Sequence, residues 1–259
     1  MDFSFKKKYG QNFIIDNNII DSIVNKAFLD KNSLVIEIGP GSGALTSKLS
    51  QIVDNVIAYE IDETLKPYLD KLPKNVEIIY GDFLKRDVLN DLKKYHFNKL
   101  YVVANLPYYI TTPIIMKIIE DKILVDKMVV MVQKEVGNRF KAKPDTKDYN
   151  SLSVFLSYYF DIKKVMDVSR NVFVPKPNVD SIVVMFNRKD SLYLKDKDVF
   201  FKLVKDSFMY KRKTLKNNLK SYDLEKIQRV LSKHNLDLSI RAESLTLEQF
   251  IDIANEISN

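Results

Sequence analysis

The sequence predicts an α/β protein in which a mostly parallel, doubly wound sheet is followed by a smaller all-α domain. The first two-thirds of the chain alternate short β-rich runs with helical patterns, which is typical of a parallel sheet covered by helices on both faces. A glycine-rich segment joins the first strong strand to a helix, and only helical patterns follow residue 190. We therefore expect two domains, residues 1–189 and residues 190–259.

Runs of apolar and β-branched residues mark the predicted strands. In chain order they are residues 34–38, 56–59, 76–80, 100–103, 128–132 and 181–186. The last run belongs to the segment 172–186, which contains Pro175 and Pro177 and is most simply interpreted as a hairpin-like pair of strands that closes the sheet. The predicted helices are residues 45–52, 63–72, 114–123, 199–210, 224–234 and 247–257.

Composition limits the possible chemistry. The chain has no cysteine and only two histidines, His96 and His234, so disulfides and thiolate catalysis are excluded and we expect no metal site. Residues 1–8 lack the apolar run of a signal peptide, and no apolar run approaches the roughly 18 residues of a membrane span. We therefore expect a cytoplasmic protein that has no membrane partner. A monomer is the default expectation, since no feature of the sequence indicates an oligomer.

The charge balance is basic, with 41 Lys and Arg residues against 34 Asp and Glu residues and a net charge of +7. Such a surplus favours polyanion binding, although a generally lysine-rich composition explains it equally well. Part of the surplus gathers in one stretch of the predicted helical domain. Its cations are Lys202, Lys205, Lys211, Arg212, Lys213, Lys216 and Lys220. We interpret these cations as phosphate contacts, and the interleaved Phe200, Phe201, Phe208 and Tyr210 as the core of a helix.

A glycine loop follows the first strong strand. Gly39, Gly41 and Gly43 stand at every second position, which lets the backbone turn tightly and approach a ligand closely. Acidic residues end the next two strands: Glu60, suited to accept both ribose hydroxyls of a nucleoside, and Asp82, suited to receive the amino group of an adenine. Because the spacing differs from that of pyrophosphate-binding loops and no P-loop lysine follows, S-adenosylmethionine fits this pattern better than a nucleotide does.

The segment Asn105-Leu106-Pro107-Tyr108 follows the strand 100–103, at the edge of the sheet where ligands bind in open α/β folds. An exocyclic adenine amine is a poor nucleophile because its lone pair is delocalised into the ring. The side-chain oxygen of Asn105 and the carbonyl of Leu106 are suited to accept its two hydrogens, while Pro107 stiffens the backbone. Tyr108 would stack on a base turned out of its helix or loop.

These motifs together resemble the small-subunit ribosomal RNA adenine dimethyltransferase family (KsgA type), which is related to the erythromycin-resistance methylases. The resemblance covers nearly the whole chain. It is carried by residues 9–14 (YGQNFI), 37–43, Glu60, Gly81-Asp82, 105–108, 133–136 (QKEV), 173–181 (FVPKPNVDS), 212–219 (RKTLKNNL) and 241–245 (RAESL).

The resemblance implies a Rossmann-like methyltransferase domain and assigns roles to further residues. Asn12, Ile14, Gly39, Glu60, Asp82 and Asn105 would contact S-adenosylmethionine, and Tyr108 and Phe173 would flank the target adenine. Ile14 stands where the family usually has Leu, and Tyr109 where some members have Asn. Separately from the resemblance, we expect Lys211, Arg212, Lys213 and Lys216 of the basic stretch to contact RNA.

The function that the resemblance implies is N6-dimethylation of two adjacent adenosines near the 3′ end of small-subunit (16S) rRNA, within an assembling small ribosomal subunit. One alternative is an erythromycin-resistance methylase acting on large-subunit rRNA, against which the segments 212–219 and 241–245 argue. Another is an assembly factor that binds without turnover, against which the intact Glu60, Asp82, Asn105 and Tyr108 argue.

Overall fold

The computed structural model describes residues 12–190 and 192–258, which form two compact units. Of these residues, 12–137 and 163–188 belong to the first unit, whereas 138–162 and those from 189 onward belong to the second. The second unit thus contains the region after residue 190 and also a segment from the middle of the chain. Tyr9, Gly10 and Gln11 of the first motif lie outside the described residues.

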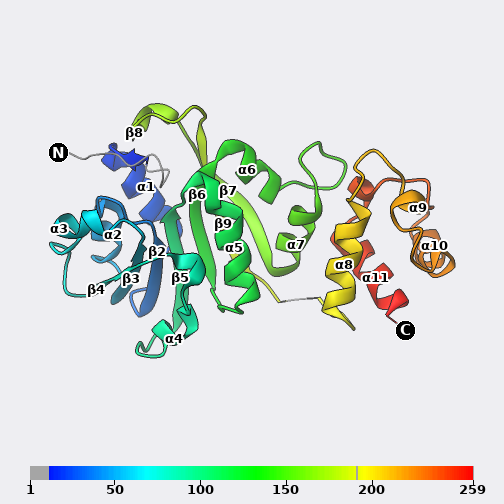
Figure 1. The fold of residues 1–259 in the computed structure, drawn as a ribbon, viewed down its shortest axis with the longest axis horizontal. Helices are drawn as coiled ribbons and strands as arrows, with labels where there is room; N and C mark the ends of the chain where they lie inside the picture. The colour runs from blue at the N-terminus through cyan, green and yellow to red at the C-terminus, as the bar shows by residue number, and fades with distance from the viewer. Residues whose placement is uncertain (1–11, 191, 259) are drawn as a thin grey trace. The chain divides into compact units, whose positions relative to one another are not determined.

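The first unit is built on a seven-stranded sheet with the strand order β4-β3-β2-β5-β6-β9-β7 (Figure 1). The pairs from β4 to β6 are parallel, and β9 runs antiparallel to β6, which confirms the predicted mostly parallel α/β sheet. The strands are β2 (Ser33–Ile38), β3 (Asn55–Glu60), β4 (Val76–Tyr80), β5 (Lys99–Asn105), β6 (Lys127–Gln133), β7 (Phe160–Val168) and β9 (Ser181–Arg188).

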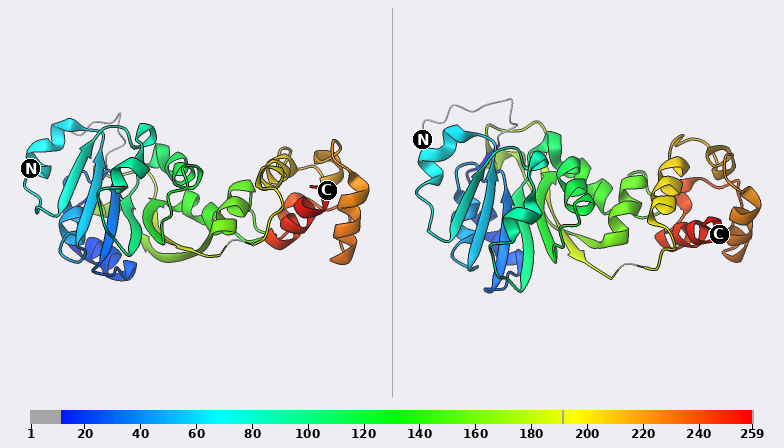
Figure 2. Two further views of the ribbon diagram at one scale, coloured as in Figure 1. Left: turned by 90° about the horizontal axis from the view of Figure 1, so that it is seen from below. Right: turned by 60° about the horizontal axis from the view of Figure 1, so that its bottom comes forward.

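Helices cover both faces of this sheet. α1 (Asn17–Ala27) and α2 (Ala44–Leu49) share a buried apolar cluster with strand residues such as Val35. Because successive side chains of a strand point to opposite faces, the neighbouring Ile36 faces the other side, where α5 (Thr111–Glu120) buries its own isoleucines. Figure 2 shows α1 and α5 on opposite faces of the sheet. Shorter elements of the unit are η2 (Glu63–Leu65), α3 (Lys66–Leu69), η3 (Phe83–Lys85), α4 (Val88–Leu92), η4 (Tyr108–Ile110) and η5 (Arg170–Val172).

The strand order places a binding edge at the carboxyl ends of the parallel strands. From β2 the chain continues to β3 on one side, whereas β5 pairs with β2 on the other side. Ligands of open α/β sheets bind where the order reverses in this way, because the loops that leave neighbouring strands diverge there. The glycine loop after β2, Glu60 at the end of β3 and Asn105 at the end of β5 all lie at this edge.

The prediction that residues 172–186 form a hairpin is wrong: only its second strand forms part of the large sheet. Residues 181–188 form β9 as expected, but its partners in the sheet are β6 and β7, and β7 is a strand that the sequence analysis missed. Strand β8 (Phe173–Val174) instead pairs antiparallel with β1 (Phe13–Ile14) in a separate two-stranded sheet. β7 lies at the edge of the large sheet and carries Lys and Asp on its exposed side, so it lacks the continuous apolar run of a central strand.

The second unit is helical. It contains α7 (Ser151–Tyr159), α8 (Lys197–Ser207), α9 (Leu215–Asn218), α10 (Leu224–Lys233), η6 (Ala242–Ser244) and α11 (Leu247–Ile257), and helix α6 (Lys134–Phe140) ends in it. The predicted helices after residue 190 are confirmed as α8, α10 and α11. Tyr149, Val154 and Tyr158 are buried in the same apolar cluster as Phe200 and Phe250, which explains why the segment 138–162 belongs to this unit.

None of the helices within residues 12–190 and 192–258 combines the length and the apolar character needed to cross a membrane.

Candidate active site

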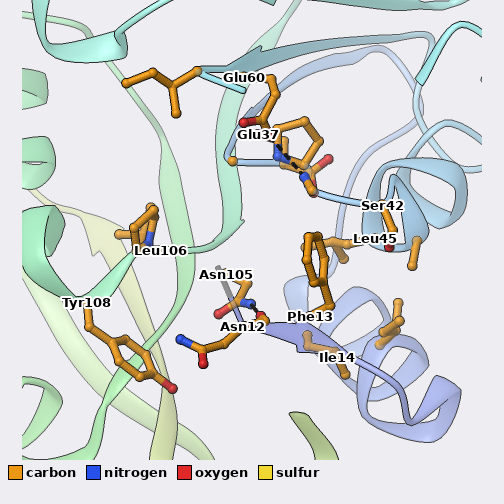
Figure 3. A pocket seen from close by; sticks show the side chains of 17 residues that line it. Asn12, Phe13, Ile14, Glu37, Ser42, Leu45, Glu60, Asn105, Leu106 and Tyr108 are labelled. Carbon is orange, nitrogen blue, oxygen red and sulfur yellow. Dashed lines mark hydrogen bonds between the residues drawn. The ribbon is translucent and has the colours of Figure 1, made fainter. Parts of the chain in front are cut away.

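A cavity opens at the carboxyl edge of the sheet, where β2, β3 and β5 end. It comprises about 750 Å³ of space between the atoms, which includes part of the open solvent. Nine of the residues predicted from the sequence lie around it. They are Asn12, Ile14, Gly39, Gly41, Glu60, Asn105, Leu106, Pro107 and Tyr108. Figure 3 shows the carboxylates of Glu37 and Glu60 at one end of the cavity and Asn105 and Tyr108 at the other.

The glycine loop forms one wall of the cavity. Gly41 has a φ of +59°, a left-handed conformation that costs an L-residue roughly 1–2 kcal/mol. The ring of Phe13 lies directly against it, so that a Cβ at Gly41 would come within 2.6 Å of a ring carbon. Residue 13 belongs to β1, so the segment before the first helix packs onto the glycine loop.

Gly41→Ala should weaken S-adenosylmethionine binding about tenfold or more, because the left-handed backbone is strained and the Phe13 ring must move. Isothermal titration calorimetry measures the dissociation constant. Gly39→Ala isolates the effect of the ring: it has the same backbone strain (φ +73°) but meets only Pro107 carbons at an ordinary 3.8 Å, so it should weaken binding less than Gly41→Ala does. Equal affinities for Gly41→Ala and the unchanged chain would contradict a close approach at this position.

Glu60 is held in place by the backbone on both sides. Its Oε2 accepts a hydrogen bond from the Gly41 amide (3.2 Å), and its Oε1 accepts one from the Asp62 amide (2.8 Å). Glu60 is 4% exposed, and burial raises the pKa of its carboxyl although these amides act in the opposite direction. The carboxylate is therefore fixed beside the glycine loop, with further lone pairs for ligand hydroxyls.

Glu37 is a second buried carboxyl group on the wall of the same cavity. It lies within the otherwise largely apolar strand β2, just before Ile38, is 1% exposed, and its Oε2 has no hydrogen-bond partner among the described residues. Burial raises the pKa of Glu37 to about 8; the nearby Thr46 hydroxyl opposes this shift, and the charge of Glu60 adds to it. An unpaired, buried carboxyl oxygen is costly, so this position suits a cationic group of a ligand.

The side chain of Asn105 is oriented by the segment before α1. Its Nδ2 donates a hydrogen bond to the carbonyl oxygen of Asn12 at 3.0 Å (Figure 3). Because a carbonyl can only accept, the amide nitrogen must face Asn12 and the side-chain oxygen must point the other way. Asn105 is thus held in the orientation that presents an acceptor.

The side chain of Tyr108 is held in place through its hydroxyl group. Its hydroxyl shares a 2.7 Å hydrogen bond with Ser181 Oγ at the start of β9, and burial raises the pKa of this phenol. Ser181 is completely buried, which limits its movement. The ring is therefore fixed in the wall of the cavity, as a stacking platform requires.

Two predicted residues lie outside the cavity wall. Asp82 accepts a hydrogen bond from the Leu84 amide (3.0 Å) just after β4, and Gly81 before it donates to the Glu60 carbonyl (2.8 Å). Phe173 is 2% exposed in β8, where it is paired in register with Ile14. The cofactor contact of Asp82 and the contact of Phe173 with the target adenine therefore stay predictions.

The predicted RNA-contacting residues all lie exposed on the second unit, in the turn after α8 and in α9. Lys211 and Arg212 line one groove together with Lys147 and Arg241, whereas Lys216 lines another with Arg229 and Lys233. Arg212, Lys213 and Lys216 form no ion pair with any described residue. The structure thus separates Lys216 from the pair Lys211 and Arg212.

The sequence assigned no role to three contributors to the site, although all three stand in segments that carry the family resemblance. Phe13 and Ser181 act through contacts with residues far along the chain, and no local pattern signals these contacts. Glu37 did carry a signal, because an ionisable residue inside a buried apolar strand is rare.

No cluster of three metal-binding side chains occurs in the part of the chain that the structure describes.

Comparison with known proteins places these features in one family. The family model described as ribosomal RNA adenine dimethylase matches residues 2–259. The chain is 44% identical to "Ribosomal RNA small subunit methyltransferase A" of Oceanobacillus iheyensis, over 98% of this chain and 90% of that protein. It is 48% identical to the protein of the same name from the Aster yellows witches'-broom phytoplasma, over 95% of this chain and 93% of that protein.

Solved structures agree with this result. A dimethyladenosine transferase from Plasmodium falciparum matches with a TM-score of 0.79 and 27% identity, over 93% of this chain and 95% of that one. The 23S rRNA methyltransferase ErmE matches with a TM-score of 0.73 and 22% identity, over 95% of this chain and 100% of that one, and so shares the fold. The chain belongs to the ribosomal RNA adenine dimethylase family.

Proposed function

We propose that this protein uses S-adenosylmethionine to dimethylate the N6 amine of two adjacent adenosines near the 3′ end of small-subunit rRNA. The observation that carries the proposal is the oriented Asn105 side chain, whose amide nitrogen is bound to Asn12 and whose oxygen therefore acts as an acceptor beside the cavity. Membership of the family and the names of the relatives support the substrate class. The particle would be an assembling small subunit.

The cavity fits the cofactor in its chemistry. Gly41 leaves a wall without a side chain, Glu60 offers a fixed carboxylate for ribose hydroxyls, and Glu37 has an unpaired oxygen for a cationic group. Asn12 and Ile14 border the cavity from the segment before α1, and Asp82 would receive the adenine amino group beyond Glu60. When bound, S-adenosylmethionine supplies an electrophilic methyl group on a sulfonium.

The chain's own residues would then act mainly by position. Asn105 Oδ1 and the Leu106 carbonyl accept the two hydrogens of the target amine, which favours a tetrahedral nitrogen with its lone pair free. Tyr108, fixed through Ser181, stacks on the base, and Phe173 borders it from β8. A strong general base is unnecessary, since the nitrogen loses its proton readily once it carries positive charge. The rate enhancement comes from orientation and electrostatics.

The exposed cations of the second unit would supply RNA affinity, which makes this unit the RNA- and ribosome-contacting part of the chain. Lys211, Arg212, Lys213 and Lys216 are the contacts we propose, and phosphate contacts of this kind position RNA without reading its sequence. The oligomeric state we propose is a monomer.

Reversing charge at Arg212 and Lys213 (Arg212→Glu with Lys213→Glu) should weaken rRNA binding and lower the salt slope of log K by about 1 per lost phosphate contact. Filter binding at several salt concentrations measures this slope. Lys202→Glu is the control: the sequence also assigned Lys202 to phosphate, but its ammonium lies 3.8 Å from Asp206 and over the ring of Tyr222, so it is not among the contacts we propose. A slope that is unchanged in the double variant would show that these cations are merely solvated.

The proposal is tested by offering radiolabelled S-adenosylmethionine together with either unmethylated small subunits or large-subunit RNA. Label in the small subunit alone is the expected result. Label in large-subunit RNA would instead indicate an erythromycin-resistance activity, and tight particle binding without any label would indicate an assembly factor.

A further inference from the structure

The turn that follows α8 exposes two large side chains. Met209 is 59% and Tyr210 61% exposed, although sequence reasoning placed Tyr210 in the core with Phe200, Phe201 and Phe208. That placement is wrong for Tyr210 alone: Phe200 is fully buried, and Phe208 packs 5.9 Å from the rings of both Tyr149 and Phe250. The helix ends at Ser207, so its apolar periodicity does not extend to residue 210.

The turn is held in one conformation from its inner side. Asn218 Oδ1 accepts a hydrogen bond from the Tyr210 amide (3.2 Å), and Asn218 Nδ2 donates to the carbonyls of Ser207 (2.7 Å) and Tyr210 (3.3 Å). The Lys213 amide also donates to the Tyr210 carbonyl, at 2.8 Å. Leu215, which is completely buried, anchors the exit of the turn. Tyr210 is therefore presented outward by a fixed backbone, so little ordering entropy is lost when it binds.

Cationic residues follow this exposed ring along the chain. Lys211, Arg212 and Lys213 follow it directly, and Lys147 and Arg241 lie in the groove that Lys211 and Arg212 line. Two carboxylates share that groove, but Asp145 accepts from the Ser244 hydroxyl (2.7 Å) and Glu243 lies 3.8 Å from Arg241. The groove thus has four cations against two engaged carboxylates, and Lys213 follows Arg212 in the chain, which makes this a surface for a polyanion.

We propose that the turn 209–213 is a stacking site for an unpaired base of an RNA loop, with Tyr210 as the platform and the neighbouring cations on the flanking phosphates. Phosphate contacts alone would need no exposed aromatic side chain, and paired bases in a helix do not offer a free face. Unpaired bases of an RNA loop do offer a free face. Stacking of such a base on an aromatic ring contributes about 1–3 kcal/mol to the binding free energy. The inference rests on the proposed rRNA substrate and adds that this unit recognises a loop.

The chain contains no tryptophan, which provides a direct reporter. Tyr210→Trp introduces a single indole whose fluorescence should be quenched by a short RNA hairpin with an unpaired purine loop, but not by a blunt duplex of the same stem. The matched control is Tyr193→Trp, since Tyr193 is also in this unit, is 75% exposed and lies outside the basic cluster. Its fluorescence should not respond to either RNA.

Affinity gives a second readout, measured on the full chain without cofactor. Tyr210→Ala should bind the hairpin about 5- to 150-fold more weakly with an unchanged salt slope, and Tyr210→Phe should retain the affinity. Wild-type hairpin affinity in Tyr210→Ala, or equal quenching of Tyr210→Trp by hairpin and duplex, would overturn the proposal. Because no methyl transfer is involved, these results are independent of the labelling test of the proposed function.

Discussion

Asn105→Ala should lower the rate constant of methyl transfer by about 10²–10³-fold, the loss seen when one oriented hydrogen-bonding group is removed from a transition state. Its side-chain oxygen is the acceptor that would draw the target amine toward a tetrahedral geometry. Single-turnover kinetics with small subunits at saturating cofactor measure the step. Binding of the particle should change by only a few-fold, whereas cofactor binding should weaken, because alanine also lacks the donor that holds the Asn12 carbonyl.

Asn105→Asp separates the two functions of this amide. It keeps an acceptor toward the cavity but removes the donor that binds the Asn12 carbonyl, so it places two acceptors against each other. We expect a loss of activity together with weaker cofactor binding, because the segment before α1 is released. Near-normal rates in Asn105→Ala would contradict the acceptor mechanism, whatever Asn105→Asp does.

Glu37→Gln should change how the stability of the cofactor-free protein depends on pH. Below about pH 4.5 the Glu37 carboxyl carries a proton in the folded and the unfolded chain, so the substitution should have little effect. From there to about pH 8 only the folded chain retains this proton. The unfolded chain then binds fewer protons, and the free energy of unfolding falls as the pH rises. Above about pH 8 the carboxyl is ionised in both states and the decrease levels off.

The free energy of unfolding of Glu37→Gln, measured relative to that of wild type, should therefore rise by on the order of 3 kcal/mol as the pH is raised from 5 to 8. Urea unfolding at several pH values measures this difference. Glu63→Gln, which makes the same change at an exposed carboxyl, serves as the control. Parallel curves for wild type and Glu37→Gln would show that the buried Glu37 carboxyl is not protonated at neutral pH.

The sheet and the motifs at its edge were predictable because each depends on local pattern. Apolar runs identified five parallel strands, and the parallel arrangement implied that the glycine loop, Glu60 and Asn105 would meet at one edge. Strand β7 was not predictable in this way, since an edge strand with Asp and Lys on its exposed side shows no continuous apolar run.

Contacts between distant segments were beyond the reach of the sequence. Nothing in it indicates that the Asn12 carbonyl orients Asn105, 93 residues away, or that Ser181 fixes Tyr108. Tyr210 was misplaced because apolar spacing continues past Ser207, where the helix itself ends. Such details depend on which backbone groups meet in the folded chain, and they decide how the site is oriented.

The most direct test of the account is the chemical identity of the product. Small subunits methylated by the purified protein would be digested to nucleosides and analysed by mass spectrometry. The account predicts N6,N6-dimethyladenosine, because the proposed acceptors, Asn105 Oδ1 and the Leu106 carbonyl, are suited to an exocyclic amine. The proposed substrate further predicts two such nucleosides per subunit. A methyl group on a ring nitrogen of adenine, or on another base, would contradict it.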